Sequence, residues 1–287
     1  MPRVVRRVAA IHDLSGFGRS SLAVVIPILS TMEVQVCSLP TAVLSAHTVY
    51  PEYCFVDLTE YMEEFIKHWK KLKLEFDCIY SGFLGSPRQI NIISGFIDTF
   101  SANRPLIVID PVMGDNGRLY ATMDAEMVEN MKRLIRKADI ITPNFTEAAY
   151  LLDEPYNPAV TEEELKTWLK RLSAMGPDKV IITSAPSPEG GKYTSVIAYD
   201  RAGGDFWKVS CVYIPANFPG TGDAFTSVIV GSLLQGDSLP LALDRGVQFI
   251  TAAIQASFGS PEQEGVLLER VLDNLRVPVL TTTYQQI

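Results

Sequence analysis

The sequence predicts one α/β domain over residues 1–287, with a mostly parallel central sheet flanked by helices on both faces. Short β-rich runs alternate with longer amphipathic stretches, a rhythm typical of repeated strand–helix–strand units. Runs such as "PLIVID" (residues 105–110) are almost wholly apolar, as expected of parallel strands buried on both sides. We find no internal repeat and no Pro/Gly/Ser-rich linker, so a single domain is the simplest interpretation.

The predicted elements follow this rhythm along the chain. Strands are expected at residues 5–11, 34–39, 78–83, 105–110, 139–142 and 179–184, and helices near 20–32, 57–73, 87–101, 124–137 and 161–175. The pattern then changes, because residues 194–214 hold two strand-like runs around Gly203 and Gly204, which predicts an antiparallel hairpin at a sheet edge. Three further helices are expected near residues 222–235, 238–257 and 264–274.

Composition limits the class of protein. The net charge of −8 and pI near 5.0 disfavour non-specific nucleic-acid binding, so no nucleic-acid partner is expected. The four cysteines are far apart in sequence and form no CxxC pair, which favours buried free thiols in a reducing compartment. We see no secretory signal and no apolar run long enough to span a membrane, and we expect a cytoplasmic protein without a membrane partner.

Polar residues gather where the predicted strands end. In parallel α/β sheets, ligands bind at the carboxyl ends of the strands. Each ending could simply cap a helix or form a turn, but five on one rim favour a site. The endings are "HDLSG" (residues 12–16), "SGFLG" (81–85), "DPVMGD" (110–115), "TPNFTE" (142–147) and "TS" (183–184).

The stretch "FPGTGDAFTS" (residues 218–227) contains the most specific signal for chemistry. Gly220, Thr221 and Gly222 precede an apolar helix, and glycines let backbone N–H groups approach an anion at a helix N-terminus. Asp223 in the first turn could accept a proton from an alcohol that attacks a phosphate, or could merely complement the helix dipole. The chain has no GxxxxGK[ST] loop, and "GFGRSS" (residues 16–21) lacks the last glycine of a dinucleotide fingerprint.

These motifs resemble those of the ribokinase-like superfamily and, within it, the pyridoxal (vitamin B6) kinases. The resemblance lies in "SGFLGS" (residues 81–86), "DPVMGD", "TPNFTEA" (142–148), "GTGDAFTS" (220–227) and "TAVLSAHT" (41–48), in the expected order from about residue 8 to about 258. It implies phosphorylation by ATP of the 5′-hydroxymethyl group of pyridoxal, pyridoxine or pyridoxamine. It also implies Mg²⁺, a monovalent cation such as K⁺, and a homodimer.

The resemblance assigns a role to each candidate residue. Asp223 would be the base and contact the substrate, and the backbone of Gly220, Thr221 and Gly222 would form an anion hole. Mg²⁺ would be held by Asp110 and Glu147, in part through water. ATP would be contacted by Asp110, Asp115, Thr142, Asn144, Thr183, Ser184, Phe218 and Thr221, and the B6 vitamer by His12, Asp13, Ser15, Thr48 and Phe83. Apart from the resemblance, residues 44–53 and 185–192 are candidate lids that could exclude water from the phosphate.

Two departures leave alternatives open. Many B6 kinases carry Ser where this chain has His12, and Tyr where it has Phe83. The stretch "HDLSGFG" (residues 12–18) is similar to "SDSSGGAG" of the hydroxymethylpyrimidine (phosphate) kinases of thiamine biosynthesis, in sharing Asp13, Ser15 and Gly16. The enzymatic alternative is therefore a hydroxymethylpyrimidine kinase, and the non-enzyme alternative is a catalytically idle protein that binds a B6 vitamer. His12 could equally be a satisfied core histidine.

Overall fold

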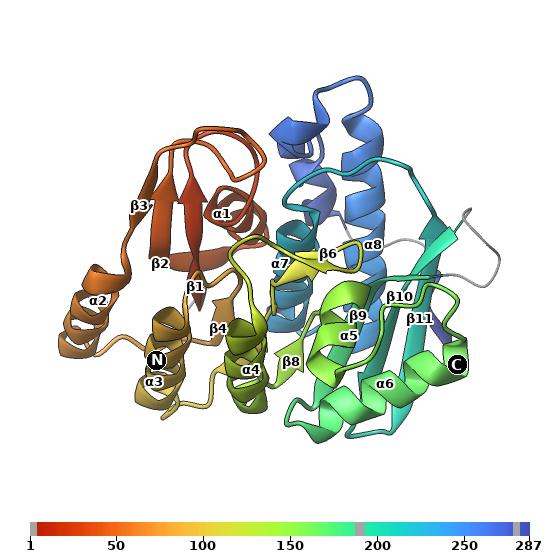
Figure 1. Cartoon of the computed structure of the whole chain (residues 1–287), viewed down its shortest axis with the longest axis horizontal. Coiled ribbons are helices and arrows are strands. Elements are labelled where there is room, and N and C mark those ends of the chain that lie inside the picture. Colours follow the sequence, from red (N-terminus) through yellow and green to blue (C-terminus); the bar gives the residue numbers. More distant parts are fainter. Residues whose placement is uncertain (1–4, 187–192, 278–281) are drawn as a thin grey trace.

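The computed structural model describes residues 5–186, 193–277 and 282–287. A ten-stranded sheet forms the centre of the molecule, with strand order β12-β11-β10-β9-β8-β5-β4-β1-β2-β3 (Figure 1). Its strands are β1 (Arg6–Ser15), β2 (Val34–Leu44), β3 (Phe55–Asp57), β4 (Cys78–Ser81), β5 (Leu106–Ile109), β8 (Ile140–Ile141), β9 (Lys179–Pro186), β10 (Tyr193–Asp200), β11 (Asp205–Val212) and β12 (Gln285–Gln286). A separate small hairpin pairs β6 (Gly114–Asp115) with β7 (Arg118–Leu119).

Six neighbouring strands, β2, β1, β4, β5, β8 and β9, pair in parallel, and the strands at both margins are antiparallel. The parallel strands are buried as their apolar sequences predict; Val8, Ala9, Ala10 and Ile11 of β1 are fully buried. Since these strands run the same way, their carboxyl ends lie on one edge of the sheet. The fold therefore brings the predicted polar endings to a common rim.

Helices cover both faces of the sheet (Figure 1). One hydrophobic cluster lies under α2 (Thr59–Lys71), α3 (Pro87–Phe100), α4 (Ala125–Leu134), α5 (Phe145–Leu152) and α6 (Glu162–Ala174). A second lies on the opposite face under α1 (Leu22–Thr31), α7 (Thr221–Gln235) and α8 (Leu239–Ala256). Two-sided burial is what the sequence predicts of a doubly covered parallel sheet.

Local sequence signals set most helix starts. Ser86 and Asp124 cap α3 and α4 by accepting from the backbone N–H groups of Gln89 and Met127. Thr161 and Glu164 form a reciprocal capping box on α6. Helices α1, α2, α7 and α8 begin without a side-chain cap bond, and Ser21 precedes α1 at φ 51°.

The predicted fold class, the six strands, the hairpin and the first seven predicted long helices are confirmed, with shifted ends. The helix expected at residues 264–274 is wrong, since this segment forms the short 3-10 turns η2 (Glu262–Glu264), η3 (Leu268–Arg270) and η4 (Leu272–Arg276). A further 3-10 turn, η1 (Ile135–Lys137), ends the fourth predicted helix. The hairpin is not outermost, because β12 pairs with β11. Sequence reasoning missed α5, β3, β6, β7 and β12.

The structure also bears on two expectations drawn from composition, the burial of the cysteines and the lack of a membrane span. The expectation that the cysteines are buried holds only for Cys78: Cys54 is exposed, and Cys37 and Cys211 are partly buried. Within residues 5–186, 193–277 and 282–287, no helix combines the length and the apolar character that crossing a membrane requires.

Candidate active site

Asp223 lies where the end of β1 meets the start of α7. Its Oδ2 accepts a hydrogen bond of 2.9 Å from the backbone N–H of Ser21, and its Oδ1 lies 3.7 Å from Nδ1 of His12. The Asp223 side chain is 14% exposed, so it is neither buried in a dry core nor free in solvent. This placement at the rim is where a group acting on a bound ligand is expected.

The two glycines of "GTGD" differ in whether a side chain would fit at their positions. Gly220 has φ 79°, and a Cβ there would lie 2.2 Å from the carbonyl oxygen of Arg19, so only glycine fits. Gly222 is exposed, and a Cβ there would meet nothing within 4 Å. The first N–H groups of a helix have no intrahelical partner, so the head of α7 presents donors and a positive dipole end to this open space. The head of α7 therefore offers backbone donors beside Asp223, to which an anion could bind.

Burial sets the charge state of Asp223. Desolvation raises the pKa of its carboxyl from 3.8 to about 7, and the charge of Asp13 raises it further, against the lowering effect of the Ser21 hydrogen bond. A carboxyl with a pKa near neutrality exchanges protons readily at physiological pH, which suits a general base.

Asp13 and Ser15 lie at the end of β1, and the charge of Asp13 acts on the Asp223 carboxylate. Asp13 is buried and accepts a 2.6 Å hydrogen bond from the hydroxyl of Ser21, while burial raises the pKa of its carboxyl. Ser15 accepts a 3.3 Å bond from the Ser20 hydroxyl. Both predicted substrate residues are thus brought to the end of β1 near Asp223, and Asp13 is already engaged in ordering Ser21.

Asp110 follows β5 and is buried. Its pKa is raised well above the ordinary value by burial and by the charges of Glu147 and Asp223, and the Thr142 hydroxyl opposes this rise. Thr142 in turn accepts a 3.0 Å hydrogen bond from the hydroxyl of Thr226 on α7. The fold therefore gathers carboxylates from β5, α5 and α7 that act on one another electrostatically.

Asn144 and Glu147 have a structural role that the sequence analysis did not assign. Asn144 caps α5, and its side-chain amide donates to the carbonyl of Gly114 over 2.8 Å. The Glu147 carboxylate accepts from the backbone N–H groups of Asn144 at 2.8 Å and Met113 at 3.0 Å, and burial raises its pKa to about 8. These contacts fasten the "DPVMGD" segment to the start of α5.

A metal ion at this site would need ligands beyond the protein. No group of three or more His, Cys, Asp and Glu side chains arranged to hold a metal occurs in the described part of the chain. Mg²⁺ usually binds through one or two carboxylates together with water and substrate phosphates, so the buried pair Asp110 and Glu147 fits a nucleotide-dependent magnesium site.

The remaining predicted residues are placed as follows. Thr183 forms a parallel bridge with Asn144, and the next residue, Ser184, is exposed with φ 54°. Asp115 is partly buried and accepts from the Asn116 N–H. Thr48 is exposed and Phe83 partly buried.

Phe218, predicted to lie near the nucleotide, is 4% exposed and packs in a hydrophobic cluster with residues of α1, α7 and α8. Its ring is therefore part of the core, and its carbonyl accepts the Thr221 hydroxyl over 3.1 Å. Of the two predicted lids, residues 187–192 of the second lie outside the described part of the chain. The first is anchored at His47, whose Nε2 lies 2.6 Å from the Gln263 carbonyl oxygen.

Three residues at the site escaped the sequence analysis. The buried Tyr80 lies under Asp223, with its hydroxyl 3.5 Å from the Asp223 carbonyl oxygen. Ser21 supplies the N–H that holds the carboxylate. The pKa of Tyr120 is raised by burial and by nearby carboxylates, including Glu147 and Asp115. Only proximity to the motifs could have pointed to these residues, because none belongs to a recognisable pattern.

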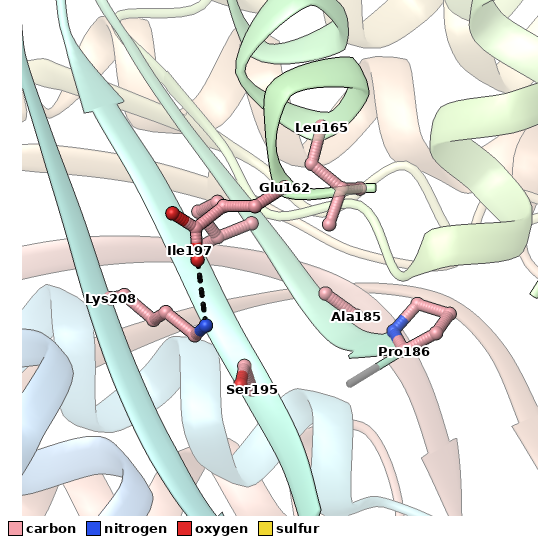
Figure 2. Close-up of a pocket in the computed structure, with 7 residues that line it drawn as sticks. All are labelled: Glu162, Leu165, Ala185, Pro186, Ser195, Ile197 and Lys208. Carbon is pink, nitrogen blue, oxygen red and sulfur yellow. Dashed lines mark hydrogen bonds and ion pairs between the residues drawn. The ribbon is translucent and has the colours of Figure 1, made fainter. Parts of the chain in front are cut away.

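A shallow recess lies elsewhere, between α6 and strands β9 to β11 (Figure 2). Its lining consists of Glu162, Leu165, Ala185, Pro186, Ser195, Ile197 and Lys208. An ion pair of 2.7 Å between Lys208 and Glu162 crosses it. Asp223 is not part of this lining, so the recess is distinct from the rim site.

The fold and the rim site together define the class: a ribokinase-like α/β protein with an acid at the head of a helix that follows a glycine turn. The family model described as phosphomethylpyrimidine kinase matches residues 29–267. The chain belongs to that family, which includes its pyridoxal kinase relatives.

Two solved structures agree with this assignment over at least 95% of this chain. A Bacteroides thetaiotaomicron protein provisionally named a phosphomethylpyrimidine kinase, crystallised with pyridoxal, is 59% identical, with a TM-score of 0.96 over 99% of this chain and 100% of that chain. Pyridoxal kinase from Lactobacillus plantarum is 31% identical, with a TM-score of 0.85 over 95% and 97% of the two chains. Pyridoxal kinase from Arabidopsis thaliana is 30% identical over 203 residues, which cover 69% of this chain and 60% of that protein.

Proposed function

We propose that this protein transfers the γ-phosphoryl group of ATP to the 5′-hydroxymethyl group of pyridoxal, pyridoxine or pyridoxamine. The observation that carries the proposal is the Asp223 carboxylate at the rim, beside the open N-terminus of α7. The Bacteroides thetaiotaomicron structure with pyridoxal and the Lactobacillus plantarum pyridoxal kinase support the substrate class.

Asp223 serves as the base. It orients the substrate hydroxyl and takes its proton as the oxygen bonds to the γ-phosphorus, while the bond from phosphorus to the bridging oxygen of ADP breaks. The N–H groups at Gly220, Thr221 and Gly222 bind the phosphoryl oxygens, where negative charge is spread in the transition state. A pKa near 7 leaves about half of Asp223 ionised at neutral pH.

The residues on the other side of the rim hold the nucleotide. Thr142, Thr183 and Ser184 contact its phosphates, and Asn144 does so with the amide hydrogen that it does not donate to Gly114. Asp115 lies near the phosphates in this arrangement. Mg²⁺, held by Asp110 and Glu147, would neutralise phosphate charge when bound.

Asp13, Ser15, Thr48 and Phe83 form the proposed vitamer pocket, while His12 is fully buried and is therefore not assigned a direct contact with the vitamer. Asp13 is the group best placed to meet a polar atom of the ring, because it is buried next to Asp223. We assign the whole chain to one kinase domain, in keeping with the continuous ten-stranded sheet.

A hydroxymethylpyrimidine (phosphate) kinase is the second candidate. The observations that favour it are the description of the matching family and the Asp13, Ser15 and Gly16 positions shared with such kinases. The same base and anion site would serve this reaction, because both substrates present a hydroxymethyl group on a nitrogen heterocycle. A catalytically idle vitamer-binding protein is disfavoured by the intact Asp223 site.

Steady-state kinetics with ATP and each alcohol decide between these functions. We expect kcat/KM for a B6 vitamer to exceed that for hydroxymethylpyrimidine by about 100-fold, or roughly 2.7 kcal/mol. The reverse preference would assign the pyrimidine. Asp223→Ala should lower kcat about 100-fold or more with nucleotide affinity little changed, whereas an unchanged rate would remove Asp223 from the mechanism.

Assembly, ions and location complete the proposal. We infer a cytoplasmic homodimer whose interface includes the β2–β3 end of the sheet, because Val43, Phe55 and Val56 there are 38%, 50% and 49% exposed on the last two strands. K⁺ is the monovalent cation expected from the family resemblance, and a rate that does not change when Na⁺ replaces K⁺ would exclude a specific requirement.

A further inference from the structure

His12 is an unpaired polar group directly below the proposed base. Its side chain is fully buried, and neither ring nitrogen has a hydrogen-bond partner among the described residues. Nδ1 lies 3.7 Å from Oδ1 of Asp223, which is beyond hydrogen-bond length. A buried nitrogen without a partner is destabilising, so a role at the site would explain why the chain carries it.

Packing fixes the direction in which this ring points. The Tyr80 ring meets it edge to face at a centroid distance of 4.4 Å. A Cβ on Gly82 would come within 2.4 Å of Nδ1 and 2.6 Å of Cε1, so the imidazole fills the space that any larger residue at position 82 would need. The ring is therefore held with Nδ1 close to the carboxylate.

Asp223 is held on its other side. Its Oδ2 accepts from the Ser21 N–H, and Ser21 is ordered by its hydroxyl bond to Asp13. Oδ1 is left facing His12 and the rim. The other titratable groups near Asp223 are acids or phenols, and at neutral pH they add negative charge or none: Asp13 on β1, Tyr80 on β4, Asp110 after β5, and Tyr120.

We propose that His12 is a positioning residue for Asp223: a neutral imidazole whose Nδ1–H donates to Oδ1 of the ionised carboxylate when the site closes on its substrate. This inference rests on the proposed role of Asp223. During transfer the substrate proton passes to Asp223 and the bridging electron pair leaves with ADP, while His12 neither gains nor loses a proton. Burial lowers the pKa of His12 to about 3, which keeps the ring neutral throughout the working range.

The hydrogen bond would act against the burial that raises the pKa of Asp223. A donor to the charged form of a carboxyl lowers its pKa, and a bond to a charged group corresponds to a shift of about one pH unit or more. His12 would thus keep more of the base ionised at neutral pH. It would also hold Oδ1 toward the substrate hydroxyl.

The test is the pKa of Asp223, measured by carboxyl ¹³C NMR in the full-length protein with pyridoxine and a non-hydrolysable ATP analogue. His12→Leu keeps a similar volume without a donor and should raise the pKa of Asp223 by about one unit. His12→Asn places a donor near the position of Nδ1 and should keep the pKa within a few tenths of wild type. His68→Leu, on the exposed face of α2, is the control and should change nothing.

An equal pKa of Asp223 in wild type and His12→Leu would overturn the proposal. If His12→Leu does not fold, His12→Asn and His12→Gln give the comparison, because Gln reaches toward the position of Nε2 rather than Nδ1. Equal values for those two variants would then overturn it. The NMR readout needs no turnover, so failure of the proposed reaction would show separately, as a wild-type protein that phosphorylates neither alcohol.

Discussion

Replacing Asp223 by Asn should stabilise the protein while removing its base. The pKa of this carboxyl is raised from 3.8 to about 7 by burial, so folding favours its protonated form. That contribution is complete below pH 3.8 and is lost as the pH rises through 7. Asn has nearly the same shape and can still accept from the Ser21 N–H, but it never carries the charge.

The size of the effect follows from the shift. At 1.36 kcal/mol per pKa unit, the full shift corresponds to about 4 kcal/mol of wild-type stability, of which roughly 1.6 kcal/mol has been lost by pH 5 and about 2.7 kcal/mol more is lost between pH 5 and 8. For a chain of this length, about 2 °C per kcal/mol predicts that the Tm difference widens by about 5 °C over this range. The substitution also removes the Asp223 charge that acts on Asp110, and this change stabilises the variant as well.

Thermal unfolding of the ligand-free protein, followed by circular dichroism at pH 5, 6, 7 and 8, measures this difference. Asp273→Asn makes the same change of charge at an exposed position and serves as the control. For this control, the plot of Tm against pH should remain parallel to that of the wild type. If the plot of Tm against pH for Asp223→Asn were also parallel to that of the wild type, burial would not raise the pKa of Asp223. The assignment of Asp223 as a base with a pKa near neutrality would then fail.

Four further outcomes are expected. The kcat/KM for pyridoxine should rise about tenfold from pH 6 to pH 8, as the ionised fraction of Asp223 increases; a flat profile would contradict control by this group. Glu147→Gln should raise the Mg²⁺ concentration needed for half-maximal rate, and an unchanged titration would exclude Glu147 as a ligand. Gly82→Ala should cost about 1–3 kcal/mol in unfolding free energy, and His12→Ser should relieve part of that cost in the double variant; additive losses would show that the two residues do not share the space. Val56→Lys should yield monomers in light scattering if β3 forms the dimer interface, whereas an unchanged mass would place the interface elsewhere or show the wild type to be monomeric.

The parallel sheet was predictable because its strands are apolar and are separated by helices with a clear period. The residues at which these elements begin and end were harder to predict, since the end of a strand depends on neighbours that are distant in sequence. The pairing of β3 with β2 and of β12 with β11 is an example, because these strands are only three and two residues long. The false helix at residues 264–274 shows the converse, since apolar side chains there pack into a core cluster from consecutive 3-10 turns.

The site shows the same division. Glycine, threonine and aspartate before an apolar helix are a local pattern, so Asp223 and the anion site could be proposed from sequence. Phe218 lies next to that pattern yet packs inward. Asn144 and Glu147 carry side chains suited to phosphate and metal, and the structure adds a capping box that no ligand argument required.

The order of residue types along the chain by itself determined the α/β class, the helix that begins within "GTGD", and the presence of acids at the ends of buried strands. Those properties depend on backbone preferences and on side-chain periodicity, which act over a few residues. Only the tertiary structure decided that His12, Ser21 and Tyr80 surround Asp223, and that burial moves the pKa of this carboxyl toward neutrality. Desolvation and electrostatic interaction depend on distances between atoms far apart in sequence, and those distances exist only once the chain is folded.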